Sequence, residues 1–378
     1  MQQIAFLQTI HKLYDDRVFY HQTKSLEKYG FNVTIISAYE KNEVDIIESE
    51  DNNNTRLIGF DSSKYKLLDL IRKLKEKLSL VNPDIIICDN PVSVFAANRY
   101  RVDKKLKNCV IVQDITEFYP SKKNLFGLDG FEKFIKKGLL TFADIIGGDY
   151  SDAFIFGEYY KSIAYRKRQK NKRYVFVPYY PKLEYIKAAP EKTDFNKWVL
   201  SYSGKLTEEK GYIRALKAVK QIAKIHPNIQ FIFNVISQDV QKEYSKDVFE
   251  NLTINFMFFK PFKEYCEFLH QNDLFLDLRD NDEENTQCLP IKLFYYLAAA
   301  RPSIFSNLDA INHEIKDFSL IGKLVDPNNL SEIVKEISFI ISNPDYYKKT
   351  CTNAKKLSEN KFNWNIIEDD FINFIKSL

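Results

Sequence analysis

The stretch Ser203-Gly-Lys-Leu-Thr-Glu-Glu-Lys-Gly211 places two lysines in a turn between a strand and a helix. The apolar run at 198–202 predicts a buried strand, and apolar residues recur at helical spacing over 212–224. Such a turn leaves backbone N–H groups unpaired at the helix N-terminus, and Lys205 and Lys210 can direct their ammonium groups into the same space. Together these groups predict an anion site suited to a diphosphate. The alternative is an ordinary surface loop with solvated lysines.

A second group of polar residues follows the first and fourth expected strands of the N-terminal half. These residues are His11, Asp15, Arg17, Asp114 and Glu117. Open α/β sheets bind ligands at the carboxyl ends of their strands, so we expect this group at a ligand-binding edge. For Asp15 the alternative is a local role, as the cap of the helix that follows.

Composition favours two globular domains and excludes several classes of partner. The chain has 378 residues, of which 45% are hydrophobic, enough for two cores of ordinary size. The net charge of +4 argues against nucleic acid as the main partner. The five cysteines include no CxxC pair and no His/Cys cluster, so we expect reduced thiols, no disulfides and no bound metal.

Targeting signals are not evident. The apolar stretch near the N-terminus is short and lacks a basic region before it, which predicts a first strand and not a signal peptide. No apolar run approaches 18 residues, so we expect no membrane-spanning segment. We therefore expect a cytoplasmic protein.

Strand-like apolar runs alternate with helical patterns along the chain, which predicts βα units and parallel sheets. In the first half the expected strands are 4–8, 32–37, 84–88, 110–113, 145–147 and 175–177. In the second half they are 198–202, 230–234, 253–256, 274–277, 303–305 and 322–325. The predicted fold class is α/β, with two doubly wound Rossmann-like domains facing a cleft. We expect these domains at 1–187 and 198–358, joined by a polar linker at 188–197.

Three motifs of the second half resemble those of glycosyltransferases with the GT-B fold, family 4 in particular. Ser203–Gly211 is similar to the family's Gly-Arg/Lys-Leu-x-x-Glu-Lys-Gly turn, and His226–Phe233 to the start of its next strand. Leu289–Pro302 is similar to its Pro-x-Lys-x-x-Glu-Tyr-x-Ala-x-Gly-x-Pro helix. Looser similarities in the first half extend the resemblance over the whole chain; they lie at 15–20, 114–120 and 143–178. The resemblance also implies that a terminal helix, 359–378, crosses back to the N-terminal domain.

The resemblance implies transfer of a sugar from a nucleotide-sugar to an acceptor hydroxyl, without metal or cofactor, often onto a lipid-linked or polymeric glycan. It implies that Gly204, Lys205 and Lys210 stabilise the charge that builds on the departing nucleoside diphosphate. Further donor contacts are implied for Pro261, Phe262, Gln287, Leu289, Pro290 and Tyr295. An aromatic ring at 262 could stack on a base, and the alternative is a core aromatic.

The donor site departs from the family's usual pattern. Active members carry two glutamates eight residues apart, and this chain has Gln287 and Tyr295 at those positions. Neither side chain carries a charge at neutral pH. Glu283 or Glu284 is an alternative source of a carboxylate, and a solvated loop is the other interpretation of that segment.

The N-terminal domain departs as well. Thr116 stands where many members have a histidine, and it precedes Glu117, which we expect to contact the acceptor or the sugar. The family's glycine-rich loop after the first strand is replaced by residues 9–16, which contain no glycine. Ala300 replaces the glycine that usually precedes the Arg-Pro pair. We expect His11, Asp15, Arg17, Asp114 and Thr116 on the acceptor side of the cleft.

Two basic segments suggest contact with a membrane surface. Residues 131–142 have aromatic and aliphatic side chains at helical spacing with lysines between them, and 166–173 contain six cations in eight residues. Anionic bilayers attract such clusters. The alternatives are a core-packed helix for the first segment and a solvated loop for the second.

The resulting prediction is a glycosyltransferase, retaining by family analogy, that serves surface polysaccharide or glycoconjugate assembly at the inner face of the membrane. Its partners would be a nucleotide-sugar and a glycan or lipid-linked acceptor, and no nucleic acid. The alternative is a silent homologue that keeps the fold and acts as a binding or scaffolding subunit.

Overall fold

The structure is a computed structural model that describes residues 2–39, 55–239, 250–259 and 262–378. The chain forms two compact units. The first consists of the residues up to Pro178 together with Ile367–Leu378, and the second of Tyr179–Ile366. The division thus falls ahead of the segment 188–197 that we expected to be the linker, and the last residues of the chain belong to the first unit.

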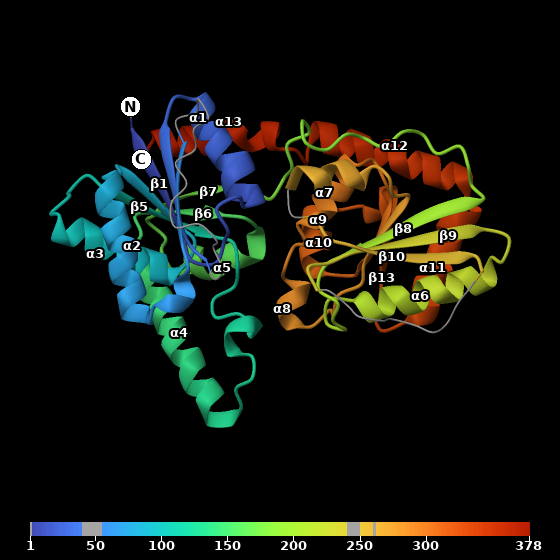
Figure 1. Cartoon of the computed structure of the whole chain (residues 1–378), viewed down its shortest axis with the longest axis horizontal. Coiled ribbons are helices and arrows are strands. Elements are labelled where there is room, and N and C mark those ends of the chain that lie inside the picture. Colours follow the sequence, from blue (N-terminus) through green and yellow to red (C-terminus); the bar gives the residue numbers. More distant parts are fainter. Residues whose placement is uncertain (1, 40–54, 240–249, 260–261) are drawn as a thin grey trace. The chain divides into compact units, whose positions relative to one another are not determined.

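The first unit is built on a parallel sheet of seven strands in the order β3-β2-β1-β4-β5-β6-β7 (Figure 1). Its strands are β1 (Gln3–Gln8), β2 (Asn32–Ala38), β3 (Thr55–Phe60), β4 (Ile85–Cys88), β5 (Val110–Ile115), β6 (Ala153–Phe156) and β7 (Arg173–Phe176). Its helices are a π-helix (Asp16–Thr23), α1 (Lys24–Lys28), α2 (Leu67–Val81), α3 (Pro91–Asp103), α4 (Gly130–Tyr150), α5 (Tyr159–Arg168) and most of α13 (Trp364–Lys376), with 3₁₀ turns at Ser62–Lys64 and Lys122–Leu125. The strand order reverses between β1 and β4, where sheets of this kind bind ligands.

The second unit repeats this plan with a parallel sheet of six strands in the order β10-β9-β8-β11-β12-β13. Its strands are β8 (Lys197–Ser203), β9 (Gln230–Ile236), β10 (Leu252–Met257), β11 (Leu274–Asp277), β12 (Ser303–Ser306) and β13 (Gly322–Val325). Its helices are α6 (Tyr212–Ile225), α7 (Phe262–Leu269), α8 (Glu283–Thr286), α9 (Lys292–Ala298), α10 (Asp309–Glu314), α11 (Leu330–Ser342) and α12 (Pro344–Asn360), with a 3₁₀ turn at Phe318–Leu320. The order reverses between β8 and β11. The predicted class, α/β with two doubly wound Rossmann-like sheets, is confirmed.

One expected strand is wrong. Residues 145–147 lie inside helix α4, and the sheet position assigned to them is occupied by β6. Their apolar pair followed by two glycines resembles a strand end, but the glycines serve helix packing: a Cβ atom added to Gly147 would lie 3.3 Å from the Pro91 Cβ atom of α3. Strand β3 was not expected at all, because its run of apolar residues is short.

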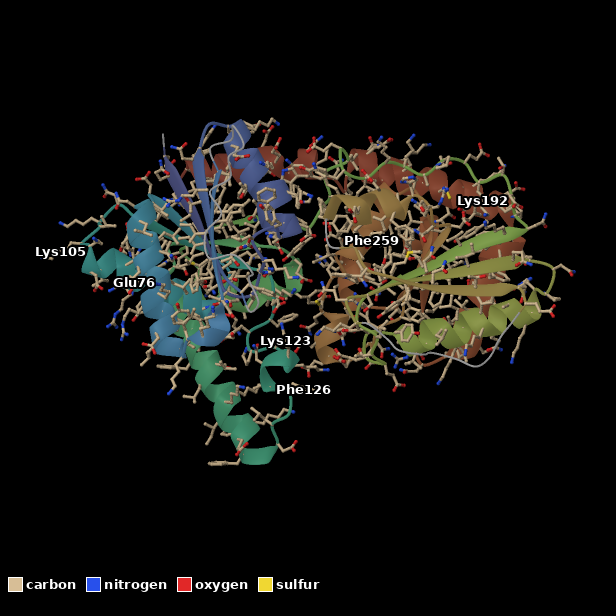
Figure 2. The ribbon with its side chains drawn as sticks, in the orientation of Figure 1. Glu76, Lys105, Lys123, Phe126, Lys192 and Phe259 are labelled. Atoms are coloured by element: carbon tan, nitrogen blue, oxygen red, sulfur yellow. The ribbon has the colours of Figure 1, made fainter. Side chains whose placement is uncertain are left out.

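Helix α4 differs from the other helices of the first unit in how little of it is covered. Its C-terminal part packs on the unit, while residues 131–139 are all exposed. In Figure 1 this part extends away from the sheet. Phe126, on the segment that leads into α4, is 89% exposed, and Figure 2 shows it near Lys123. Among the residues that the structure describes, no helix has the length and apolar character needed to cross a bilayer.

Candidate active site

The turn from Ser203 to Gly211 connects β8 to α6 at the reversal point of the second sheet. Tyr202, buried at the end of β8, holds the two ends of this turn. Its hydroxyl oxygen lies 2.6 Å from the carbonyl oxygen of Lys205 and 3.1 Å from that of Lys210. The hydroxyl group of Tyr202 therefore fixes the backbone at both lysines.

Gly211 closes the turn and brings it against the neighbouring strand. Its φ angle is +86°, a left-handed conformation that glycine adopts at low cost. A Cβ atom at this position would lie 2.2 Å from the carbonyl carbon of Leu278, just after β11. Because a side chain at this position would clash, only glycine allows the lysine-bearing turn to lie against the carboxyl end of β11.

Several backbone N–H groups of the turn are already used inside the unit. The Gly204 N–H donates to the carbonyl oxygen of Ile236 (2.9 Å) and the Leu206 N–H to the carboxylate of Asp239 (2.9 Å). The N–H groups at 210, 211 and 212 donate to oxygens of Thr207 and Glu208 within the turn. The expectation of unpaired N–H groups is wrong for these five residues, because the turn is long enough to fold on itself. An anion here would be held mainly by side-chain cations.

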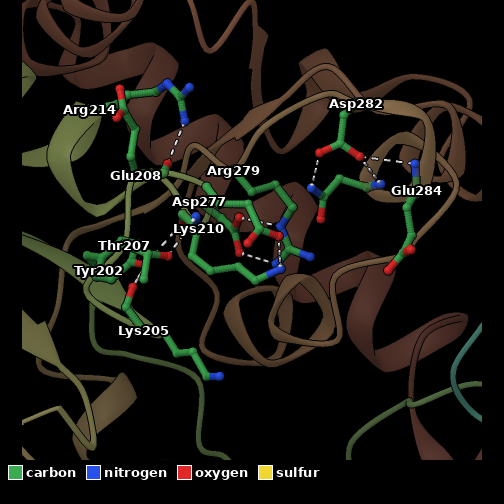
Figure 3. Close-up of polar contacts among 12 residues, drawn as sticks. Tyr202, Lys205, Thr207, Glu208, Lys210, Arg214, Asp277, Arg279, Asp282 and Glu284 are labelled. Atoms are coloured by element: carbon green, nitrogen blue, oxygen red, sulfur yellow. Dashed lines mark hydrogen bonds and ion pairs between the residues drawn. The ribbon is translucent and has the colours of Figure 1, made fainter. Parts of the chain in front are cut away.

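The two predicted lysines have different surroundings. Lys210 pairs with the carboxylate of Glu209, 2.9 Å from its ammonium group. The pKa of that carboxyl is lowered by this hydrogen bond and, to a smaller extent, by one from Asn285 of α8. Lys205 is exposed and forms no ion pair with the described residues; in Figure 3 its side chain extends away from the others. Lys205 is thus the cation of the turn that a ligand can use without breaking an ion pair.

A charge cluster centred on the buried carboxylate of Asp277 lies beside the turn and was not predicted from the sequence. Asp277, the last residue of β11, accepts two hydrogen bonds from Arg279 (2.8 and 2.7 Å; Figure 3). It also pairs with Lys292 of α9 at 3.0 Å. The Lys292 ammonium group also donates to the carbonyl oxygen of Ser203. This lysine therefore connects α9 and β11 to the first residue of the turn.

The charges of this cluster determine its protonation. Burial alone would raise the pKa of the Asp277 carboxyl, but the charges of Arg279 and Lys292 outweigh burial and hold that pKa well below its usual range. Burial lowers the pKa of the Lys292 ammonium group although the charge of Asp277 opposes it, and the charges of Arg279 and Lys210 act in the same direction as burial. An anion placed against these cations would therefore relieve their mutual repulsion.

The cluster carries more positive than negative charge. Arg279 and Lys292 face one carboxylate, Asp277, which leaves an excess of one cation beside the turn, to which exposed Lys205 adds another. Arg279 and Lys292 are half-buried, and excess charge that is partly removed from water is unfavourable without a counterion, so this edge of the sheet is suited to an anion. Lys292 is the lysine of the Pro-x-Lys motif. That motif could have indicated from the sequence that this lysine belongs to the site.

The aromatic residues predicted to contact the donor pack on one another. The ring centroids of Phe262 and Tyr295 are 5.9 Å apart, and these rings also contact Tyr185 (5.8 Å) and Tyr265 (6.4 Å), respectively. Tyr295 is 4% exposed. Pro261 lies outside the described residues. The packed aromatic that we named as the alternative for Phe262 is thus present, and a base-stacking role stays a prediction.

The other predicted donor residues surround the short helix α8. Gln287 directly follows α8 and is half-buried, whereas Leu289 and Pro290 are buried. Glu283 and Glu284 form the first turn of this helix, the first exposed and the second half-buried. Asn285 of the same helix contacts the Glu209–Lys210 pair, so α8 lies against the lysine-bearing turn. Their roles toward a donor stay predictions.

In the first unit, Arg17 and Asp114 form a buried ion pair. The guanidinium group of Arg17, on the π-helix, donates two hydrogen bonds to the Asp114 carboxylate at the end of β5 (3.1 and 3.0 Å). The Arg17 guanidinium group also donates to the carbonyl oxygen of Val177 (2.6 Å). The amide of Gln22 donates to the Asp114 carboxylate (3.0 Å). Both charged side chains are more than nine-tenths buried. Arg17 and Asp114 therefore satisfy each other's charge, whereas the side-chain oxygen of Gln22 finds no hydrogen-bond partner among the described residues.

His11 and Asp15 form a second pair on the loop after β1. Nδ1 of His11 lies 3.1 Å from the Asp15 carboxylate, which also caps the π-helix by accepting from the N–H groups of Arg17 and Val18. Burial alone would lower the pKa of His11, but the hydrogen bond and charge of Asp15, with the charges of Asp89 and Glu117, raise it to about 9. His11 is therefore an imidazolium at neutral pH.

Five of the six predicted N-terminal residues line one small cavity of about 10 Å³, room for a single water molecule. They are His11, Asp15, Arg17, Asp114 and Thr116. The Thr116 hydroxyl and the amide of Gln8, both buried, find no hydrogen-bond partner among the described residues. Glu117 is exposed and lies outside this lining. The sequence thus identified a polar pocket, although it gave no sign of Gln8.

Comparison with known proteins identifies the fold. Residues 186–357 match the family of glycosyl transferases group 1. Sucrose-phosphate synthase from Thermosynechococcus elongatus is similar in structure, with a TM-score of 0.75 at 14% identity over 100% of this chain and 99% of that one. An Anabaena protein, Alr3699/HepE in complex with UDP-glucose, gives a TM-score of 0.69 at 11% identity, with both chains fully covered.

A curated relative supports the same assignment. An uncharacterized glycosyltransferase of Haemophilus influenzae is 24% identical over 176 residues, which are 46% of this chain and 48% of the relative. The match thus spans about half of that relative's length. The predicted resemblance is confirmed: residues 186–357 of the second unit match the group 1 glycosyl transferases, and the two units have the GT-B fold.

Proposed function

We propose that the protein is a glycosyltransferase that moves a sugar from a nucleotide-sugar donor to a hydroxyl of a glycan or lipid-linked acceptor. The transfer proceeds with retention of the anomeric configuration and without a metal ion. It serves surface polysaccharide or glycoconjugate assembly in the cytoplasm.

The excess of cations beside the Gly204 turn is the observation that carries this proposal. When a nucleoside diphosphate leaves the sugar, negative charge builds on its phosphate oxygens. Exposed Lys205 and the half-buried cations Arg279 and Lys292 offer preformed positive charge to that leaving group, and Tyr202 and Asp277 hold the arrangement rigid. Preorganised charge of this kind stabilises the transition state more than the ground state. Such cations take over the task that a metal performs elsewhere.

The polar cavity of the first unit supports a separate task. Gln8 and Thr116 hold buried polar groups without partners, which cost free energy unless a water or a ligand hydroxyl satisfies them. Protonated His11 stands on the same wall. We assign this edge of the first unit to the acceptor, whose hydroxyl groups match the donors and acceptors found there.

The test is a thermal-shift screen with nucleoside mono- and diphosphates and nucleotide-sugars, followed by turnover assays. A ligand present at a hundred times its Kd stabilises the native state by about 2.7 kcal/mol, which such a screen detects. Release of nucleoside diphosphate in the presence of an acceptor shows transfer, NMR of the product shows the anomeric configuration, and EDTA tests the metal. No stabilisation by any nucleotide would contradict the proposal.

A second function, nucleotide binding without transfer, is favoured by the burial of Tyr295. Where the family carries a glutamate for the ribose hydroxyls, this chain has a tyrosine that is 4% exposed and packed among aromatic rings. This function predicts stabilisation by a nucleoside diphosphate but no turnover with any donor and acceptor. Gln287→Glu separates the two functions: it lowers turnover in an adapted enzyme, and is neutral or beneficial in a silent homologue.

A further inference from the structure

Seven large apolar side chains stand exposed between residues 126 and 145, on α4 and the segment leading into it. They are Phe126, Phe131, Phe134, Ile135, Leu139, Phe142 and Ile145. The exposed fraction reaches 89% for Phe126, 76% for Phe131 and 75% for Phe134. Scattered single residues of this kind are ordinary, but a contiguous group marks an interaction surface.

The spacing of these residues places them on one side of the helix. Positions 131, 134, 135, 139 and 142 follow the i, i+3, i+4 pattern of a single helical face, and Gly138 lies in the same stripe. The lysines at 133, 136 and 137 alternate with the stripe and lie around the opposite side. An apolar face rich in phenylalanine, backed by lysines, is the pattern of a helix that lies in a membrane interface.

The other end of α4 is fixed to the first unit. Lys172 donates to the carbonyl oxygens of Gly148 (2.7 Å) and Asp149 (2.8 Å), which satisfies the carbonyl end of the helix. Arg168 pairs with Asp144 of α4 at 2.9 Å. Arg168 and Lys172, two of the six cations of the basic segment 166–173, thus anchor α4. For these two residues the interpretation as part of a solvated loop is wrong. The exposed stripe is therefore presented by a helix that is held at its base.

We propose that the surface formed by residues 122–145, the α4 surface, docks onto an anionic phospholipid bilayer. The helix lies in the interface with its phenylalanine stripe toward the acyl chains and its lysines toward the headgroups. The segment 122–142 contains five lysines against Asp129 and Glu132, a net charge of +3. A second copy of the chain is a poorer occupant, because a two-fold contact through this stripe would bring two like-charged segments together.

The α4 surface does not depend on the proposed transferase activity, since a silent homologue would carry it equally. It would bring the protein to the surface where lipid-linked acceptors are found. Each inserted phenylalanine contributes on the order of a tenfold gain in partitioning, and each lysine near an anionic surface about fivefold.

The experiment is co-sedimentation of the full chain with sucrose-loaded vesicles of phosphatidylglycerol and phosphatidylcholine, beside vesicles of phosphatidylcholine alone. We expect binding to the anionic vesicles, at least a tenfold loss for Phe131→Ser/Phe134→Ser, and about a hundredfold loss for Lys133→Gln/Lys136→Gln/Lys137→Gln. Leu68→Ser is the matched control, because Leu68 of α2 in the same unit is also 75% exposed and should leave binding unchanged.

Three outcomes would overturn this inference. They are no sedimentation with either vesicle, equal binding of the parent and the Phe131→Ser/Phe134→Ser variant, and a dimer in size-exclusion chromatography that the same variant abolishes without any vesicle binding. The thermal shift with nucleoside diphosphate is recorded on every variant. Because these substitutions are far from the lysine-bearing turn in sequence and lie in the other unit, that shift should stay constant, which separates failure here from failure of the proposed function.

Discussion

The two units carry charged residues at equivalent places, where the strand order of each sheet reverses, but they balance the charges differently. In the first unit two cations at this edge each have a carboxylate: Arg17 has Asp114, and His11 has Asp15. In the second unit Arg279 and Lys292 share the single carboxylate of Asp277, and Lys205 has none among the described residues.

The loops after the first strand of each sheet show the same contrast. In the first unit the N–H groups of Thr9 and Ile10 donate to the half-buried carboxylate of Asp89 (2.8 and 3.1 Å), so an acid of the protein takes the place of an anionic ligand. In the second unit the corresponding loop carries Lys205 and Lys210. One N–H group of this loop, that of Leu206, likewise donates to a carboxylate of the protein, Asp239 (2.9 Å), but Lys205 forms no ion pair among the described residues. We therefore expect an added anion to bind at the second site and not at the first. The predictions that follow test this difference, beginning with the largest expected effect.

Arg17→Met should destabilise the protein by about 3–5 kcal/mol, because it leaves the Asp114 carboxylate buried without its partner. Urea unfolding followed by circular dichroism measures the loss. Lys205→Met, which removes an exposed cation of the other site, should change stability by less than about 0.5 kcal/mol.

The double variant Arg17→Met/Asp114→Leu is the control, since it removes both charges and should recover most of the lost stability. A loss of less than about 1 kcal/mol for Arg17→Met alone would show that this pair does not hold the first site together, and the contrast between the two units would disappear.

Lys205→Ala should weaken binding of a nucleoside diphosphate by about 1.5–3 kcal/mol, the range of a charge-assisted hydrogen bond, without loss of stability. Lys210→Ala should have a smaller effect, because the charge of Lys210 is already compensated by Glu209 at 2.9 Å. Calorimetry with the nucleotide that gives the largest thermal shift measures both. Lys217→Ala, on exposed α6 surface, is the matched control. Unchanged affinity in Lys205→Ala would place the anion elsewhere.

His11 should make the stability of the first unit depend on pH. Its pKa in the folded state is about 9, against 6.5 for an unperturbed histidine, so its stabilising contribution is complete below pH 6.5 and is lost as the pH rises through 9. The shift corresponds to at most about 3 kcal/mol. Because the side chain is 20% exposed, we expect about 1–2 kcal/mol after solvent screening.

The measurement compares urea unfolding of the parent and His11→Gln from pH 6 to pH 10. The charged groups that face His11 are Asp15, Asp89 and Glu117, whose negative charges raise the pKa of its imidazolium. The difference between the two proteins should be largest at pH 6 and vanish near pH 10. A difference that is the same at every pH would mean that His11 acts by packing and not by charge.

The sheets were predictable from the sequence because each buried parallel strand is a continuous apolar run. The six strands of the second unit all lie where those runs lie. The error at 145–147 arose from glycines that serve packing against Pro91 and not the end of a strand. Periodicity alone does not separate a short apolar run of a helix from a strand.

The candidate site was predictable only where its residues are neighbours in the sequence. The lysine pair at 205 and 210 lies on one turn, and a turn can be recognised locally. The contact of Lys292 with Asp277 and Ser203 joins three elements, and only the tertiary fold brings them together. The hydrogen bonds that occupy the turn's N–H groups also depend on tertiary contacts, as with Gly204 and Ile236.

The smallest expected effect comes from a backbone contrast between the units. Asn82 ends α2 in the first unit with φ +51°, and Ala300, just after α9 in the second, has φ +55°. Asparagine tolerates this left-handed conformation, whereas for alanine it costs about 1–2 kcal/mol. Ala300→Gly should therefore stabilise the protein by about 0.5–1 kcal/mol, after the greater flexibility of glycine in the unfolded chain is subtracted.

The neighbouring residue provides the control for Ala300→Gly. Ala299 is equally buried but has φ −70°, which alanine adopts without strain, so Ala299→Gly should destabilise the protein by about 0.5–1 kcal/mol. Urea unfolding of the two variants should thus give shifts of opposite sign. Two shifts of the same sign would mean that loss of the buried methyl group outweighs relief of the backbone. Opposite signs would show that the second unit keeps a strained helix end directly after the helix that carries Lys292.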